Sequence, residues 1–227
     1  NSKPISPFFC GANGRPAKAN DPQETPVQYD LYRIPFNEGK GGKAEPLMGA
    51  SANGMSNSFP KYSPDNKWIV FVKARNGLLM RPDSRLYMIP ADGGAAREMN
   101  CNMKLMNSWH TWSPNSRWLA FVSKSNTPYT QLFLTHVDAN GNDSPPILVP
   151  RCTMDNRAVN IPEFINIASD GIVSIKAPAV DFARFLTSGD HWLRQGRYDQ
   201  AIAEFKKTLA MNPECSQALY SVGFALQ

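Results

Sequence analysis

Residues that could do chemistry are few in this 227-residue chain, and their spacing does not favour catalysis. The chain has three histidines and four cysteines, namely His110, His136, His191, Cys10, Cys101, Cys152 and Cys215. None of the cysteines forms a Cys-x-x-Cys pair, so neither a zinc knuckle nor a thioredoxin-type redox site is predicted. The sequence has no Gly-x-Ser-x-Gly elbow and no phosphate-binding loop. We therefore expect a protein that is not an enzyme, with no cofactor and no metal.

The composition of the chain argues against further classes of function, namely nucleic-acid binding and membrane spanning. Lysine and arginine exceed aspartate and glutamate by five charges, but these basic residues are not clustered with aromatic residues as nucleic-acid binding would require. We interpret the excess as a mildly basic surface. No apolar run approaches the ~20 residues of a membrane span. Nineteen prolines argue against a mostly helical chain, because proline disrupts helix interiors.

A repeat organises the middle of the chain. Residues 57–72 match residues 107–122, and each copy reads as strand, tight turn, strand, with Ser-Pro-Asp-Asn or Ser-Pro-Asn-Ser at the turn. A third strand is predicted at 85–90 and at 131–136, and a fourth at 96–99 and at 146–149. Four short strands in about 50 residues are typical of one propeller blade.

The repeat resembles the blades of the TolB-type, WD-repeat-like β-propeller family. The matching positions are Pro60, Ser63, Pro64, Asp65, Ile69 and Phe71 in the first copy, and Ser113, Pro114, Leu119 and Phe121 in the second. The resemblance implies an all-β partial propeller over residues 29–166, with about two and a half blades. Residues 31–35 match residues 86–90, so the chain enters in the middle of a blade. Residues 160–164 resemble another opening strand, which either joins an incomplete blade or leads into the next domain.

The two ends differ from this pattern. Residues 1–28 hold five prolines and are predicted to form an irregular arm. Residues 167–180 read as a linker. From Asp181 the apolar residues recur at helical spacing, and the positions of Gly189, Tyr198, Ala201 and Phe205 resemble a tetratricopeptide repeat. Residues 181–227 are thus expected to begin an α-helical solenoid, with one full repeat and one truncated repeat.

The resemblances suggest residues that could bind a partner. Asn57, Asn107 and Asn160 open the inner strands and would present amides at the channel mouth, although hydrogen bonding to neighbouring backbone is the alternative that we favour. In the helical part, the concave face implied by the repeat family includes Leu186, Asp190, Leu193 and Arg194. A plain surface ion pair is the favoured alternative for Asp190 and Arg194.

Two further pairs leave alternatives open. His110 and Glu163 stand in opening strands and could form a metal or proton site near the channel, whereas ordinary strand hydrogen bonding is the favoured alternative. Cys101 and Cys152 precede corresponding opening strands. They could form a disulfide in an oxidising compartment, but we favour buried free thiols.

Both modules are known chiefly as binding platforms, so we expect a protein–protein interaction scaffold. The segments 126–136, 143–146 and 157–164 resemble a subgroup of bacterial propeller–tetratricopeptide fusions that accompany extracytoplasmic multihaem cytochromes. That resemblance implies an extracytoplasmic assembly factor whose partner is a multihaem c-type cytochrome complex, with a signal peptide outside the present sequence. The alternatives are the gating propeller of a serine peptidase and a TolB-like cell-envelope protein.

Overall fold

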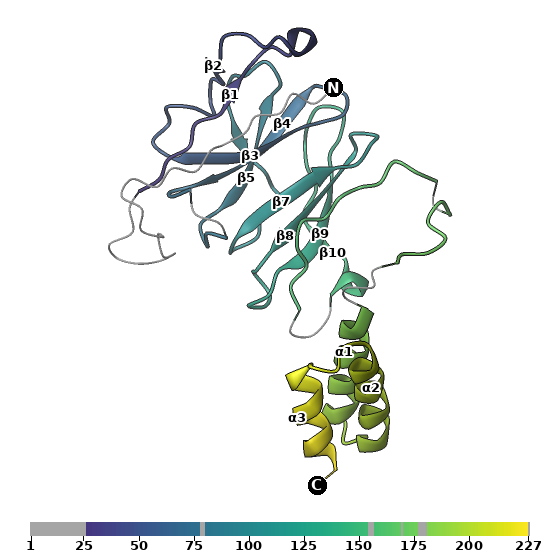
Figure 1. Cartoon of the computed structure of the whole chain (residues 1–227). Coiled ribbons are helices and arrows are strands. Elements are labelled where there is room, and N and C mark those ends of the chain that lie inside the picture. Colours follow the sequence, from purple (N-terminus) through teal and green to yellow (C-terminus); the bar gives the residue numbers. More distant parts are fainter. Residues whose placement is uncertain (1–25, 78–79, 154–156, 169, 177–180, 227) are drawn as a thin grey trace. The chain divides into compact units, whose positions relative to one another are not determined.

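The computed structural model describes residues 26–77, 80–153, 157–168, 170–176 and 181–226. The chain divides into two compact units, Asn1–Asn166 and Ile167–Gln227. The described strands belong to the first unit and the α-helices to the second (Figure 1). Residues 1–25 of the predicted arm lie outside the described residues. No helix among the described residues is long and apolar enough to cross a membrane.

Two four-stranded antiparallel sheets make up most of the first unit. Sheet 1 consists of β3 (Ser56–Tyr62), β4 (Trp68–Ala74), β5 (Arg85–Pro90) and β6 (Arg97–Glu98), in that spatial order. Sheet 2 consists of β7 (Asn107–Trp112), β8 (Trp118–Ser123), β9 (Gln131–His136) and β10 (Ile147–Leu148). The strands predicted for these two sheets are confirmed, although the fourth strand of each sheet has only two residues.

The remaining strands precede sheet 1 and are short. β1 (Tyr32–Arg33) pairs antiparallel with β2 (Glu45–Pro46), and the 3-10 turn Asn37–Gly39 lies between them. This pair corresponds to the third and fourth strands of a sheet, as the match between residues 31–35 and 86–90 predicted. A second 3-10 turn, Pro150–Cys152, follows β10.

The predicted hairpin turns form because a serine side chain organises each one. Ser63 Oγ contacts Asp65 Oδ1 at 2.6 Å and accepts the Trp68 N–H at 3.0 Å. Ser113 does the same with Asn115 and Trp118, at 2.7 and 2.9 Å. Asn66 and Ser116, at the corresponding positions of the two turns, have positive φ angles of 58° and 60°. Both turns therefore adopt a left-handed conformation that glycine would adopt at lower cost.

The core lies on both faces of sheet 1. One face contributes Val70, Val72, Leu86 and Met88, which pack with Leu119, Phe121 and Phe133 of sheet 2. The other face contributes Ile69, Phe71 and Ile89, which pack with Leu31, Leu47 and Ala50 beside β1 and β2. These apolar side chains are 4% exposed or less. Burial on both faces explains why β4 is apolar at successive positions rather than at alternate ones.

An ion pair between a buried carboxylate and a partly exposed arginine joins the two sheets away from their opening strands. Arg97 of β6 lies 2.9 Å from the carboxylate of Asp143, whose side chain is fully buried. The other carboxylate oxygen accepts the N–H of Cys101 at 2.7 Å. Arg97 also donates to the carbonyl of Gly141. The carboxylate is thus fully paired, as a buried charge must be.

The second unit contains α1 (Asp181–Arg194), α2 (Tyr198–Met211) and α3 (Ser216–Ala225). Leu186, Ala201, Phe205 and Ala218 form its core. A Cβ placed on Gly189 would lie 2.4 Å from the Phe205 ring, so only glycine lets α1 and α2 approach this closely. Gly223 holds the equivalent place in α3, but a Cβ there would meet nothing within 4 Å.

Candidate functional site

The candidate site lies along the opening strands β3 and β7 and along residues 157–166, which we call the opening segment. All three begin with the same backbone hydrogen bond to the residue before an earlier third strand. The N–H of Asn57 donates to Tyr29 O at 2.7 Å, that of Asn107 to Ser84 O at 3.1 Å, and that of Val159 to Thr130 O at 3.0 Å. The opening segment is therefore seated as the first strand of a further sheet would be.

This geometry corrects the predicted alignment of the opening segment. Val159, and not Asn160, occupies the position of Asn57 and Asn107. Asn160 is exposed, and the described residues 157–168 form no strand, in contrast to the prediction for 160–164. The correction places Glu163 with Lys61 and Thr111, whereas the sequence alignment had placed it with His110. The alignment slipped by one residue because Asn160 mimics the asparagine of the other two copies.

Asn57 and Asn107 are fully buried and hydrogen-bonded. The Asn107 amide donates to Ser84 O and Met103 O, and its oxygen accepts the N–H of Met103 at 2.9 Å. The Asn57 amide likewise donates to Tyr29 O, and its oxygen accepts a hydrogen bond from the Asn53 amide. Burial favours the structural alternative for both residues, and their role in binding a partner stays a prediction.

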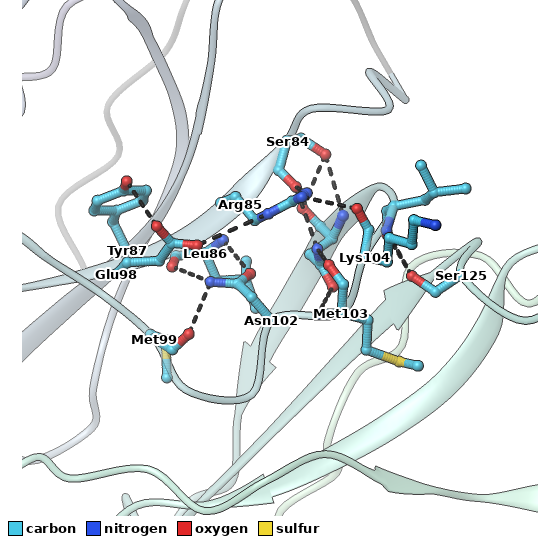
Figure 2. A network of polar contacts seen from close by, with 12 residues as sticks. Ser84, Arg85, Leu86, Tyr87, Glu98, Met99, Asn102, Met103, Lys104 and Ser125 are labelled. Carbon is cyan, nitrogen blue, oxygen red and sulfur yellow. Dashed lines mark hydrogen bonds and ion pairs between the residues drawn. The ribbon is translucent and has the colours of Figure 1, made fainter.

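Figure 2 shows the polar network around this anchor, which holds the loop between β6 and β7 against the start of β5. Asn102 accepts the N–H of Leu86 at 2.7 Å and donates to the carbonyls of Leu86 and Met99 at 2.9 Å. Arg85 donates to Lys104 O at 2.7 Å. Glu98 accepts a hydrogen bond from the Tyr87 hydroxyl at 3.1 Å. The loop is thus fixed, which fixes where β7 begins.

The opening elements share a strained residue two positions after the anchor. Phe59, Trp109 and Ile161 have positive φ angles of 53°, 49° and 34°. In β3 and β7 the strand register shifts at this point, between Ser58 and Lys61 and between Ser108 and Thr111. Positive φ is unfavourable for residues with a Cβ, by about 1 kcal/mol or more. The bulge turns the apolar side chain outward, leaving Phe59 38% and Ile161 64% exposed.

Two positions further on, the three elements meet through polar side chains. Glu163 accepts a hydrogen bond from the Thr111 hydroxyl at 2.8 Å, and its other oxygen lies 3.2 Å from Lys61 Nζ. Lys61 and Glu163 are about half exposed. We call Phe59, Trp109, Ile161, Lys61 and Glu163, together with the buried Thr111 that holds Glu163, the axial surface. Sequence reasoning missed Lys61 and Thr111, although their shared repeat position could have identified them.

His110 is buried beneath this surface. Its Nε2 donates to the carbonyl of Val70 at 2.9 Å. Burial lowers the pKa of His110 to about 4, with a smaller effect in the same direction from Lys61 and opposing effects from the Val70 carbonyl and Glu163. The imidazole is therefore neutral at pH 7. No group of three or more metal-ligating side chains occurs in the part of the chain that the structure describes. The observed contact joins His110 of sheet 2 to a backbone carbonyl of sheet 1, and the roles of His110 and Glu163 in a site stay a prediction.

The helical candidates are divided between core and surface. Leu186 is buried and Leu193 packs against the same core, so both contribute to the bundle. Asp190 accepts a hydrogen bond from Gln217 of α3 at 2.9 Å, and Arg194 is exposed. The partner-binding role of all four residues stays a prediction.

The described cysteines are free thiols. Cys101 is buried and Cys152 is exposed, so the disulfide between them is not formed and only Cys101 matches the expected buried thiol. Burial raises the pKa of Cys101 far above its ordinary value, and the Asp143 carboxylate raises it further. A thiol with so high a pKa is unreactive. Cys10 lies outside the described residues.

The chain is only distantly similar to known proteins. No family model matches the chain, and no curated protein matches it. Among solved structures, a puromycin hydrolase is 20% identical over 52% of this chain, with a TM-score of 0.40. TolB from Acinetobacter baumannii is 17% identical and a putative TolB from Agrobacterium tumefaciens 20% identical, each over 52% of the chain with a TM-score of 0.35. The match spans 20%, 27% and 42% of these chains, respectively. Likeness of this degree carries no conclusion about activity.

Proposed function

We propose that the chain is a non-catalytic scaffold that binds a protein partner through the axial surface. The observation that supports this proposal is the repeated bulge. Three successive opening elements each hold an apolar residue at positive φ, and the side chains of Phe59 and Ile161 are exposed while that of Trp109 is half-buried. Strain that recurs at one position needs compensation, and functional sites are where such strain gathers.

The composition of the axial surface suits a protein ligand. Exposed aromatic and aliphatic side chains supply contact area, and tryptophan is enriched among residues that dominate binding energy. The neighbouring Lys61–Glu163 pair is half exposed and supplies a polar rim. An extended or looped polypeptide can use both kinds of contact.

For the identity of the partner, the resemblance of segments 126–136, 143–146 and 157–164 provides the support. We propose an extracytoplasmic multihaem c-type cytochrome complex, with the chain acting as its assembly factor. The individual protein that these segments resemble is the assembly factor of hydrazine dehydrogenase. In this role the scaffold holds an apoprotein or a subunit until assembly is complete.

The test is capture of haem proteins from native extract by the immobilised chain. Trp109→Ala and Ile161→Asp should reduce the captured haem absorbance at least tenfold, because both remove contact area from the axial surface. Ile147→Asp is the matched control, since Ile147 is 50% exposed on β10, away from the axial surface. Equal capture by all variants, or peptide hydrolysis by the purified chain, would contradict the proposal and favour the peptidase alternative.

A further inference from the structure

The loops at one end of sheets 1 and 2 carry an excess of basic residues. These loops connect β4 to β5, β6 to β7 and β8 to β9, and they span 75–84, 100–106 and 124–130. They contain four basic residues and one acidic residue, namely Arg75, Arg81, Lys104, Lys124 and Asp83. The loops at the opposite end of the same two sheets contain two basic and four acidic residues, in the ranges 63–67, 91–96, 113–117 and 137–146. The two ends of the sheets therefore differ in the sign of their charge.

The one acidic residue of the basic end is already paired. Asp83 lies 3.4 Å from Arg81 Nε and accepts the N–H of Arg75 at 2.8 Å. The side chains of Arg75, Lys104 and Lys124 form no ion pair within the part of the chain that the structure describes. Arg75 and Lys104 are exposed, and Lys124 is half-buried. Three positive charges thus lie at this end with no carboxylate beside them.

Hydrogen bonds hold the three loops against one another. Arg85 donates to Lys104 O at 2.7 Å (Figure 2). The N–H of Met106 donates to Pro82 O at 3.0 Å, and the N–H of Lys124 donates to Met106 O at 3.3 Å. The loops that carry the charges are therefore fixed before any partner binds, and a partner need not order them at a cost in entropy.

An exposed apolar side chain lies among these charges. Leu105 follows Lys104 in the same loop and is 41% exposed. We call Arg75, Lys104, Leu105 and Lys124 the basic face, and it shares no residue with the axial surface. Apolar contact area bordered by charged side chains is typical of a protein interface. Nucleic acid is a poorer fit, because single strands stack their bases on several aromatic side chains and these loops contain only Tyr129.

We propose that the basic face binds an acidic segment of a protein partner, one in which carboxylate and apolar side chains alternate. The carboxylates of the segment pair with Arg75, Lys104 and Lys124, and an apolar side chain of the segment covers Leu105. Complementary charge raises the rate of association and selects against basic partners. Because these charges are exposed, dissolved salt weakens the attraction.

Fluorescence anisotropy of a labelled peptide tests the proposal. The probe is a short peptide of alternating glutamate and leucine, added to the full chain. Its affinity should fall at least tenfold between ~50 mM and ~500 mM salt, because salt screens exposed charges. Arg75→Glu, Lys104→Glu and Lys124→Glu in one chain should also lower the affinity at least tenfold. The matched control is Lys67→Glu with Arg117→Glu, which reverses two charges at the opposite end of the sheets and should change the affinity less than twofold.

Three results would overturn the proposal. The first is no salt-sensitive binding of the peptide by the full chain. The second is equal binding by the basic-face variant and the control variant. The third is tighter binding of a single-stranded DNA of the same net charge, which would assign the basic face to nucleic acid. If the triple reversal lowers the melting temperature, Arg75→Gln with Lys104→Gln keeps the test decisive, since this neutral pair should still weaken binding at least threefold.

Discussion

The strand β7 and the opening segment start with the same backbone hydrogen bond, yet only β7 becomes a strand. β7 pairs with β8, whereas no strand among the described residues pairs with the opening segment. The helical unit shows the same contrast between Gly189, which is covered by Phe205, and Gly223, which faces open space. In both units the local sequence determines where a repeated element begins. Packing against a neighbouring element determines whether it becomes regular and buried.

The largest expected effect concerns the interface between sheets 1 and 2. We call it the completed interface, because both of these sheets have four strands. Asp143→Ala removes a buried carboxylate and leaves Arg97 and the Cys101 N–H without their partner. Because Arg97 is 38% exposed and can be solvated by water, we expect the cost of the lost hydrogen bonds to be about 1–3 kcal/mol. Urea unfolding of the first unit should show this loss. Asp92→Ala is the control, because the Arg33–Asp92 pair is exposed and should leave the midpoint unchanged. Equal effects would remove the distinction between the completed interface and the surface.

The second effect is a pH dependence confined to the completed interface. The folded-state pKa of His110, about 4, lies below its unfolded value of 6.5, so the unfolded state binds the proton more readily. Stability is therefore complete above pH 6.5 and falls as the pH drops toward 4. Between pH 8 and pH 5 the loss is about 2 kcal/mol.

Urea midpoints measured across this range check the pH dependence. His110→Gln should flatten the profile, and His191→Gln should not, because His191 is exposed on α1. A profile that keeps its slope in the His110→Gln variant would assign the dependence to another group.

The third effect compares the covered and open glycines of the helical unit. Gly189→Ala forces a methyl group into the Phe205 ring, and overpacking of this kind costs about 1–3 kcal/mol. Gly223→Ala meets open space and should instead stabilise α3 by up to about 1 kcal/mol through helix propensity. Thermal melts followed by circular dichroism at 222 nm measure both. A change in melting temperature in the same direction for both variants would contradict the difference between the two glycines.

The smallest effect concerns the opening segment. Glu163→Gln weakens a half-exposed ion pair, so global stability should fall by no more than about 0.5 kcal/mol. The free energy of local opening of the segment should fall by more than the global free energy of unfolding, because Glu163 holds the segment against Thr111 and Lys61. Hydrogen exchange at the Val159 amide should become faster, while exchange at the Asn107 amide should not change. Slower exchange at Val159 would show that Glu163 strains the segment.

The sequence was sufficient for the regular strands, because the Ser-Pro turn and the apolar runs recur in both sheets. It was insufficient at residues 157–166, where one local feature misleads. Asn160 imitates the anchor asparagine although Val159 holds that position. The axial surface was only partly predictable, because the contact of Lys61 and Thr111 with Glu163 depends on packing between sheets.

The anchor hydrogen bonds of Asn57, Asn107 and Val159 also set an order of events during synthesis. Each anchor bonds to a residue that precedes it in the chain, so a nascent chain leaving the ribosome already holds the acceptor when the donor emerges. Each new opening strand is thereby registered on finished structure before its own hairpin partner has been translated. Folding can then advance from the N-terminus by one repeat at a time, and little unpaired strand is exposed to aggregation along the way.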